Sequence, residues 1–123
     1  MPATSLHIRL IANRDAEPEA ALARLNALSA NIAGAPLQVG EREPYDKLGL
    51  YSDSVWSRVD ASVQSLLALY EAITAVSPDG WREDEPDREE TLREAIWDNR
   101  STDEPLFDNA VAWAHVIVRE DDA

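Results

Sequence analysis

Residues 110–120 read AVAWAHVIVRE, and no other stretch of the sequence has so clear a strand pattern. In a strand, alternate side chains point to opposite faces. One face here carries small and branched apolar side chains: Ala110, Ala112, Ala114, Val116 and Val118. The other carries mostly larger ones: Val111, Trp113, His115, Ile117 and Arg119. Because both faces are largely apolar, we expect a strand in the middle of a sheet, with helices packed closely on the small-residue face.

The rest of the chain supplies partners for that strand. Residues 5–12, SLHIRLIA, alternate between apolar and polar side chains and predict a first strand with one face on the core. Residues 36–41 and 48–59 predict two further extended segments. Residues 18–33 and 62–76 predict two helices, because leucines recur in both at helical spacing.

Residues 86–99 predict a third helix. Pro86 suits its first turn, acidic residues cluster at its start, and Glu89 and Arg93 have the spacing of a stabilising pair. On this helix Trp97 lies outside the core stripe, on an acidic outer face. A large aromatic side chain ringed by charges is typical of a binding hot spot. The alternative is that Trp97 packs under a neighbouring loop or stacks on Arg93.

Together these elements predict a single globular domain over residues 1–123. Strands and helices follow one another in the order β-α-β-(β)-α-α-β, with neither an internal repeat nor a linker. We therefore expect an α+β fold, in which a single-layer sheet of three to five strands carries about three helices packed mainly on one face.

The composition is strongly acidic. Among the 123 residues, 24 are acidic and 11 are basic, for a net charge of −13, and residues 79–108 hold 12 of the acids. Such a charge disfavours binding to nucleic acids and to anionic membranes, and it favours a basic protein partner through long-range attraction. The alternative is that the charge serves solubility alone.

The chain has no cysteine, which excludes disulfides and thiolate chemistry and fits a reducing cytoplasm. The first residues lack the basic start and the long apolar run of a signal peptide. No stretch has the apolar length of a membrane span. We therefore expect a cytoplasmic protein that does not bind membranes.

The sequence contains no recognisable catalytic, cofactor-binding or metal-binding motif. No serine lies in a G-x-S-x-G elbow, the four glycines are too scattered for a phosphate-binding loop, and H-E-x-x-H is missing. The acids around Pro86 lack the offsets of a calcium loop. We therefore expect no enzyme activity, no catalytic residues, no cofactor and no metal.

The two histidines, His7 and His115, both lie on expected strands. If those strands are neighbours, both histidines share one face of the sheet with Arg9 and Trp113, and a ligand groove or a small active site can form there. The alternative is an ordinary half-exposed sheet face, because the spacing fixes no nucleophile or acid beside the histidines.

Residues 80–99, GWREDEPDREETLREAIWDN, together with the small size and the acidic charge, resemble small bacterial immunity proteins and antitoxins. The resemblance implies a protein-binding inhibitor that covers the active site of a basic toxin enzyme, for example a nuclease, without binding nucleic acid itself. On this interpretation the partner-binding residues are Trp81, Glu83, Asp84, Glu85, Asp87, Glu90, Arg93, Glu94, Trp97 and Asp98.

Three alternatives stay open. The protein can be a regulatory DNA mimic, in which carboxylates take the place of phosphates. It can be a small enzyme or ligand-binding domain that uses the face of His7 and His115. It can also form a weak homodimer rather than a monomer, through the alanines on one side of the first helix: Ala20, Ala23, Ala27 and Ala30.

Overall fold

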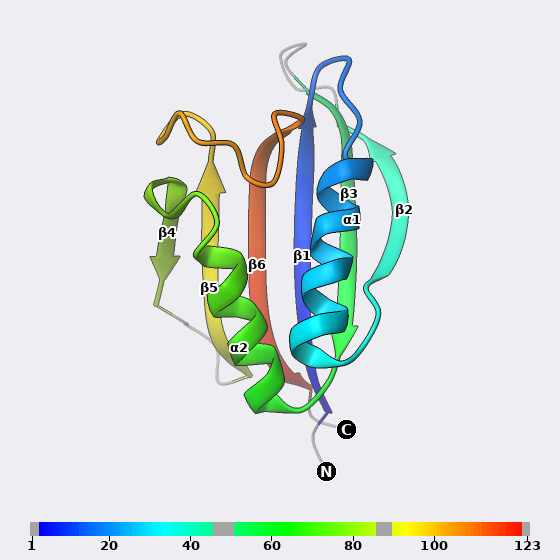
Figure 1. Ribbon diagram of the computed structural model, residues 1–123, viewed down its shortest axis with the longest axis vertical. Helices are drawn as coiled ribbons and strands as arrows, with labels where there is room; N and C mark the ends of the chain where they lie inside the picture. Colours follow the sequence, from blue (N-terminus) through cyan, green and yellow to red (C-terminus); the bar gives the residue numbers. More distant parts are fainter. Residues whose placement is uncertain (1–2, 46–50, 86–89, 122–123) are drawn as a thin grey trace.

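The computed structural model describes residues 3–45, 51–85 and 90–121. Within these residues, six strands form one sheet in the order β2-β3-β1-β6-β5-β4, and every neighbouring pair is antiparallel (Figure 1). The strands are β1 Ala3–Asn13, β2 Gln38–Pro44, β3 Tyr51–Asp60, β4 Trp81–Asp84, β5 Thr91–Asp98 and β6 Val111–Asp121. The helices are α1 Glu19–Leu28, which continues as a π-helical turn Ser29–Ala33, α2 Val63–Thr74 and a short 3₁₀ turn Pro78–Gly80.

The central pair of strands is β1 and β6, which confirms the strands expected at residues 5–12 and 110–120. Leu6 lies opposite Val118 and Ile8 lies opposite Val116, and all four side chains are buried. The small-residue face of β6 is the face that lies under the helices, because Ala114, Val116 and Val118 belong to the same core cluster as the helix leucines. The pattern of side chains in β6 therefore correctly predicted that this strand lies in the middle of the sheet and that the helices pack on its small-residue face.

Both α-helices lie on one side of the sheet (Figure 1). Their buried side chains are Ala21, Leu22 and Leu25 in α1, and Leu66, Leu69, Tyr70 and Ile73 in α2. Helix α2 begins where the Ser62 hydroxyl accepts a hydrogen bond from the backbone N–H of Ser65 at 3.2 Å. The turn after α1 ends at Gly34, whose φ of 67° lies in the left-handed region that glycine adopts without strain.

The expected fold class is wrong in two respects. The sheet has six strands rather than three to five, and the described residues contain two α-helices rather than about three. Both errors come from residues 81–98. Trp81–Asp84 form an edge strand that was not expected, and Thr91–Asp98 form a strand instead of the helix expected over residues 86–99. Residues 86–89, the start of that expected helix, lie outside the described residues.

Tertiary pairing explains the difference at β5. This strand lies between β4 and β6, with Trp97 opposite both Trp81 and Ala114. The good helix formers in its sequence favour a helix only weakly, and strand pairing outweighs such local preferences.

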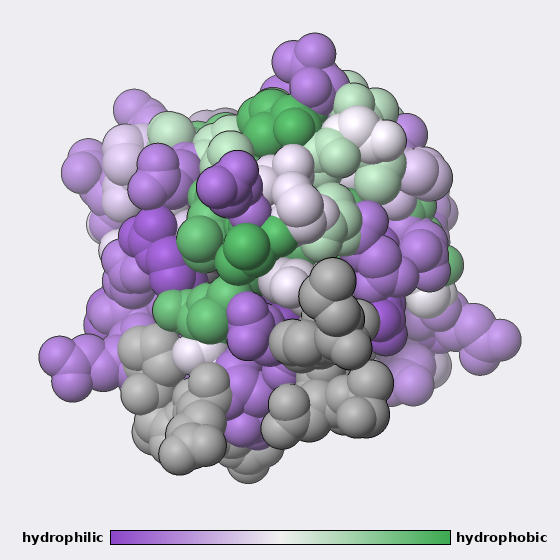
Figure 2. Space-filling view, turned by 90° about the horizontal axis from the view of Figure 1, so that it is seen from below, coloured by the Kyte–Doolittle hydropathy of each residue, from purple (hydrophilic) through white to green (hydrophobic). Residues whose placement is uncertain are grey.

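Seen along the strands from the end at which β1 begins, the molecule has hydrophobic residues in the middle of its surface and hydrophilic residues around them (Figure 2). This pattern is expected where a core between two layers reaches the end of the molecule. The face of the sheet opposite to α1 and α2 is covered by no helix of the described residues (Figure 1).

Candidate functional site

The uncovered side of the sheet carries the candidate site, and we call it the open face. The strand register places Arg9 of β1 between Trp56 of β3 and His115 of β6. Ile96 of β5 lies on the far side of His115, and Arg82 of β4 lies beside Ile96. One row of side chains therefore crosses five strands, over about 19 Å at the ordinary spacing between strands.

Large apolar side chains are left partly uncovered on the open face. Trp56 is 43% exposed, and among the described residues only Val39 is also a large hydrophobic residue with such exposure. Trp113 and Ile117 flank His115 along β6 and are half-buried. Contiguous exposed apolar surface of this kind marks interaction sites on soluble proteins.

Arg9 has a fixed position in this row. Its Nε donates a hydrogen bond to the hydroxyl of Ser54 at 2.7 Å. Its guanidinium carbon lies 5.3 Å from the centre of the Tyr45 ring and 5.9 Å from that of Trp56. These distances allow cation–π attraction to both rings, which restricts the position of the guanidinium group.

His115 is held by a carboxylate and two indoles. Its Nε2 lies 2.9 Å from Oε2 of Glu94, and its ring centre lies 6.1 Å from that of Trp56 and 6.0 Å from that of Trp113. A histidine oriented by a carboxylate is half of a general-base arrangement, which also needs a nucleophile or a substrate proton within reach. The other two neighbours of the ring are indoles, so these contacts bring no nucleophile to His115.

The open face is hollowed at one corner. A hollow of about 310 Å³ is lined by Gly80, Arg82, Ile96, Asp98, Arg100, Ser101 and Trp113. The Asp98 carboxylate accepts a hydrogen bond from Nη2 of Arg100 at 2.9 Å, and this ion pair holds the pKa of Asp98 below its ordinary value. The hollow has apolar walls from Trp113 and Ile96 and a charged rim, a combination that suits the side chain of a partner.

The structure brings together part of the histidine face expected from the sequence. Arg9 and His115 are direct neighbours, and Trp113 is in ring contact with His115. His7 lies two residues before Arg9 in β1 and is paired with Ile117 of β6. Its Nε2 is 3.0 Å from the hydroxyl oxygen of Ser5. His7 therefore lies outside the row that joins Arg9 to His115.

Sequence reasoning missed Trp56, Tyr45 and Ser54 as members of this site. A signal for Trp56 was present, because Val55 and Val59 alternate with Trp56 in β3 and are buried on the opposite face. The neighbourhood of Arg9 depends on β3 pairing with β1, which the sequence does not reveal.

The nine described residues among the ten expected to bind a partner do not form one surface. The helix that was to present them does not exist, and Trp97 is 1% exposed, with its Nε1 donating to the hydroxyl of buried Ser77 at 3.1 Å. Trp81 is half-buried and its Nε1 donates to the carbonyl oxygen of Val76 at 2.9 Å. Burial under a neighbouring segment, the alternative interpretation of Trp97, is therefore correct.

The charged members of that set divide between the two sides of the sheet. Asp84, Glu94 and Asp98 lie on the open face, since the register alternates them with buried Ala95 and Trp97. Glu83 and Arg93 lie on the helix side, and Glu85 and Glu90 are exposed at strand ends. Asp87 lies outside the described residues.

Arg93 is the centre of a clamp that joins α2, β4 and β5. Its Nε and Nη2 donate to both carboxylate oxygens of Glu83 at 2.8 and 3.1 Å, and its Nη1 donates to Glu71 at 3.1 Å. Its guanidinium carbon lies 4.4 Å from the ring centre of Tyr70. The bond from Arg93 lowers the pKa of Glu83, while burial raises the pKa of Tyr70. These contacts engage the Arg93 guanidinium within the protein.

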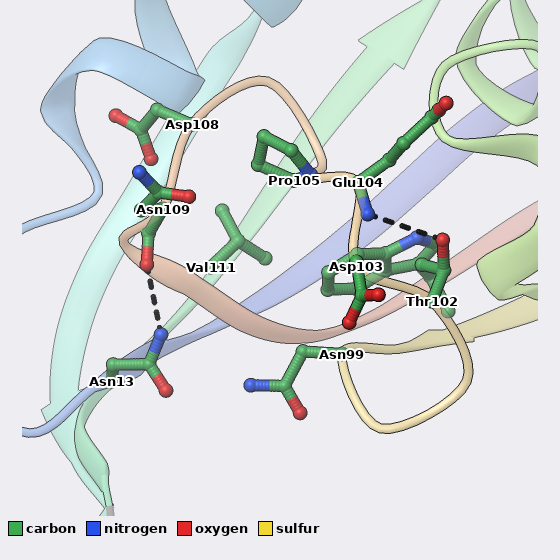
Figure 3. Close-up of a pocket in the computed structure, with 10 residues that line it drawn as sticks. Asn13, Asn99, Thr102, Asp103, Glu104, Pro105, Asp108, Asn109 and Val111 are labelled. Carbon is green, nitrogen blue, oxygen red and sulfur yellow. Dashed lines mark hydrogen bonds between the residues drawn. The ribbon is translucent and has the colours of Figure 1, made fainter.

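A second hollow, of about 250 Å³, lies beside the loop that connects β5 to β6 (Figure 3). Asn13 donates to the carbonyl oxygen of Asn109 at 2.9 Å, and the backbone N–H of Glu104 donates to the hydroxyl of Thr102 at 3.2 Å. Asp108 accepts a hydrogen bond from the backbone N–H of Ala110 at 2.8 Å. The bond from Asn13 thus holds the loop against the end of β1, while the other two bonds lie within the loop and at its end.

In residues 3–45, 51–85 and 90–121, no group of three or more His, Asp or Glu side chains is arranged to hold a metal ion. The helices in that part of the chain are too short or too polar to cross a membrane. Comparison of the chain with protein-family models, with curated proteins and with solved structures finds no match.

Proposed function

We propose that this protein is a small acidic inhibitor, of the immunity-protein or antitoxin kind, that binds a basic protein and has no enzyme activity of its own. We also propose that the open face, rather than a helix over residues 86–99, makes the contact. The observation that carries this proposal is Trp56, a tryptophan left 43% exposed beside Arg9 on a face that no described helix covers.

The composition of the open face supports a protein contact. Trp and Arg are the residues most enriched at binding hot spots, and here they are adjacent and held in place by Ser54 and His115. The uncovered area is on the order of 600 Å², from the four strand spacings that the row crosses and ten-residue strands, which approaches the roughly 800 Å² per partner of a standard interface.

The charge of the chain supports a basic partner. With 24 acidic and 11 basic residues, the protein repels nucleic acid and attracts a positively charged surface. Asp84, Glu94 and Asp98 place carboxylates on the open face beside the apolar row. A partner with an apolar centre and a lysine- and arginine-rich rim complements this arrangement, and a toxin nuclease is one class with such a surface.

We propose a cytoplasmic location, because a chain without cysteine is suited to a reducing compartment. An inhibitor that protects its own cell from a toxin acts in the compartment where that toxin reaches its target.

The proposal is tested by capture of partners from a lysate of the native host at 50 and 300 mM salt, followed by an activity assay on the retained protein. We expect one basic protein, held at low salt and released at high salt, whose enzyme activity falls when the acidic protein is added in equimolar amount. Retention of acidic or salt-insensitive proteins alone contradicts the proposal, and so does a basic partner whose activity is unchanged.

Two further outcomes of the same experiment separate the alternatives. If the partner is a nucleic-acid-binding protein without enzyme activity and DNA displaces it, the protein is a DNA mimic instead. If a small molecule rather than a protein is retained, the open face is a ligand-binding site.

A further inference from the structure

Arg9 has hydrogen-bonding capacity that the described residues do not use. A guanidinium group has five N–H donors. Within residues 3–45, 51–85 and 90–121, the only hydrogen bond of Arg9 runs from Nε to Ser54, and its remaining contacts are the rings of Tyr45 and Trp56. The two terminal nitrogens thus have no acceptor among the described residues.

The free donors are pre-oriented. The bond to Ser54 at 2.7 Å fixes one edge of the guanidinium plane, and the two rings restrict its tilt. Because little side-chain freedom is left, an anion that binds the terminal nitrogens causes only a small further loss of entropy. The half-buried position of Arg9 also strengthens an ion pair relative to one in open water.

Two described acids of the open face pair with other residues than Arg9. Glu94, a carboxylate on the open face, bonds to His115 at 2.9 Å. Asp60 accepts from Nε of Arg58 at 2.8 Å. A cation that has no ion pair within the described residues, at the centre of a face and in a protein with a net charge of −13, is unusual and points to a ligand.

We propose that Arg9 is a binding site for one carboxylate, which its two terminal nitrogens receive as a bidentate pair. A carboxylate matches the flat fork of an arginine in both shape and charge. A phosphate dianion fits less well, because the row supplies a single arginine for it and the surrounding protein is strongly negative.

Two sources can supply this carboxylate: an Asp or Glu side chain of the protein partner, or a free carboxylic acid. The first source rests on the proposed function, in which Arg9 pairs with an acidic group inside the otherwise basic surface of the partner. The binding site itself does not depend on that function.

The test is an NMR titration of the ¹⁵N-labelled protein with sodium acetate, sodium phosphate or sodium chloride at constant ionic strength. We expect acetate alone to shift the Arg9 Nε–H and the Trp56 indole N–H signals in a saturable manner. Arg9→Lys, which keeps the charge and loses the fork, should weaken acetate binding about tenfold. The control Arg14→Gln removes an arginine that is 71% exposed outside the site, and it should bind acetate like the wild type.

The dispersion of the backbone signals shows whether Arg9→Lys is folded. Shifts that are the same with chloride as with acetate, a preference for phosphate, or unchanged acetate binding by folded Arg9→Lys would each overturn the proposal. No partner is needed for this titration, so its failure leaves the capture experiment unaffected.

A second arm identifies the source of the carboxylate. The probes are the blocked peptide acetyl-Lys-Leu-Glu-Leu-Lys-amide and its counterpart with Gln in place of Glu. At least about tenfold tighter binding of the Glu peptide than of acetate, with no saturable binding of the Gln peptide, assigns the carboxylate to a protein. Tighter binding of acetate than of the Glu peptide assigns the carboxylate to a free acid. This result also supports the binding site at Arg9.

Discussion

Glu94 and His115 lie side by side on the open face and join β5 to β6 through a contact of 2.9 Å between Oε2 and Nε2. Their side chains are 21% and 23% exposed, so the contact is shielded from water on most sides. Because His115 also touches the rings of Trp56 and Trp113, the pair fixes the middle of the row in which Arg9 lies. The open face is therefore an ordered surface before any partner arrives.

A double-mutant cycle with Glu94→Gln and His115→Phe measures this contact. We expect a favourable coupling free energy of about 0.5–1.5 kcal/mol, the usual net contribution of a partly buried hydrogen bond. The measurement is chemical denaturation of the wild type, both single variants and the double variant at one pH. A coupling of zero would mean that the pair does not organise the open face.

The two tryptophans Trp97 and Trp56 should differ sharply in their contribution to stability. Trp97→Ala removes a side chain that is 1% exposed and should lower the free energy of unfolding by about 3–5 kcal/mol. Trp56→Ala removes one that is 43% exposed and should cost about 1 kcal/mol or less. Urea denaturation followed by circular dichroism checks both values, and similar costs for the two variants would contradict the assignment of Trp97 to the core.

Gly80 is required by the close approach of Trp97. A Cβ at position 80 would lie 2.6 Å from Cδ1 of Trp97 and 2.8 Å from Cγ2 of Thr102. Gly80→Ala should therefore cost about 1–3 kcal/mol and change the fluorescence of the buried indole. The comparison variant Gly34→Ala meets no atom within 4 Å and should cost only about 1 kcal/mol, for its left-handed φ, without altering that fluorescence. An unchanged emission spectrum in Gly80→Ala would argue against this packing.

These contacts also show why part of the fold was predictable from the sequence. In β1 and β6 the alternation is long and one face is buried, so pattern and structure agree. In β5, Leu92 and Ile96 are four residues apart, a spacing that places them on one side of a helix and equally on one side of a strand. The glutamates and Pro86, which precede these two residues in the sequence, favour a helix. The strand forms because β5 pairs with β4 and β6.

The candidate site was predictable only in part, for the same reason. Arg9, Trp113 and His115 were expected to share a face if the first and last strands paired, and they do. Trp56 reaches Arg9 because β3 pairs with β1 on its other side, and Tyr45 does so because it follows β2, which pairs with β3. That pairing is a long-range choice among several strands, which residue patterns within single strands do not encode.

The Arg93–Glu83 pair predicts how stability depends on pH. The bond from Arg93 lowers the pKa of Glu83 below its ordinary value of 4.5 in the folded protein. The unfolded chain therefore binds this proton more readily, so the contribution of the pair is present above about pH 4.5 and is lost as the pH falls through the folded pKa. In the Glu83→Gln variant, the free energy of unfolding should therefore decrease less than in the wild type as the pH falls below about 4.5.

The matched control is Glu41→Gln, which removes an exposed carboxylate that makes no ion pair within the described residues. Denaturation between pH 7 and pH 3 compares both variants with the wild type. If Glu83→Gln loses stability below pH 4.5 as steeply as the control does, the pair does not contribute to the acid response.

The affinity of the captured basic partner for three forms of the protein tests the central claim most directly. Isothermal titration calorimetry compares the wild type with Trp56→Ala on the open face and with Val39→Ala. Val39 is the other exposed large hydrophobic residue in the part of the chain that the structure describes, 51% exposed on edge strand β2. We predict that Trp56→Ala weakens binding by about 2 kcal/mol or more, roughly 30-fold, whereas Val39→Ala binds like the wild type. Equal affinity of the wild type and a folded Trp56→Ala variant would contradict the assignment of the open face as the inhibitory surface.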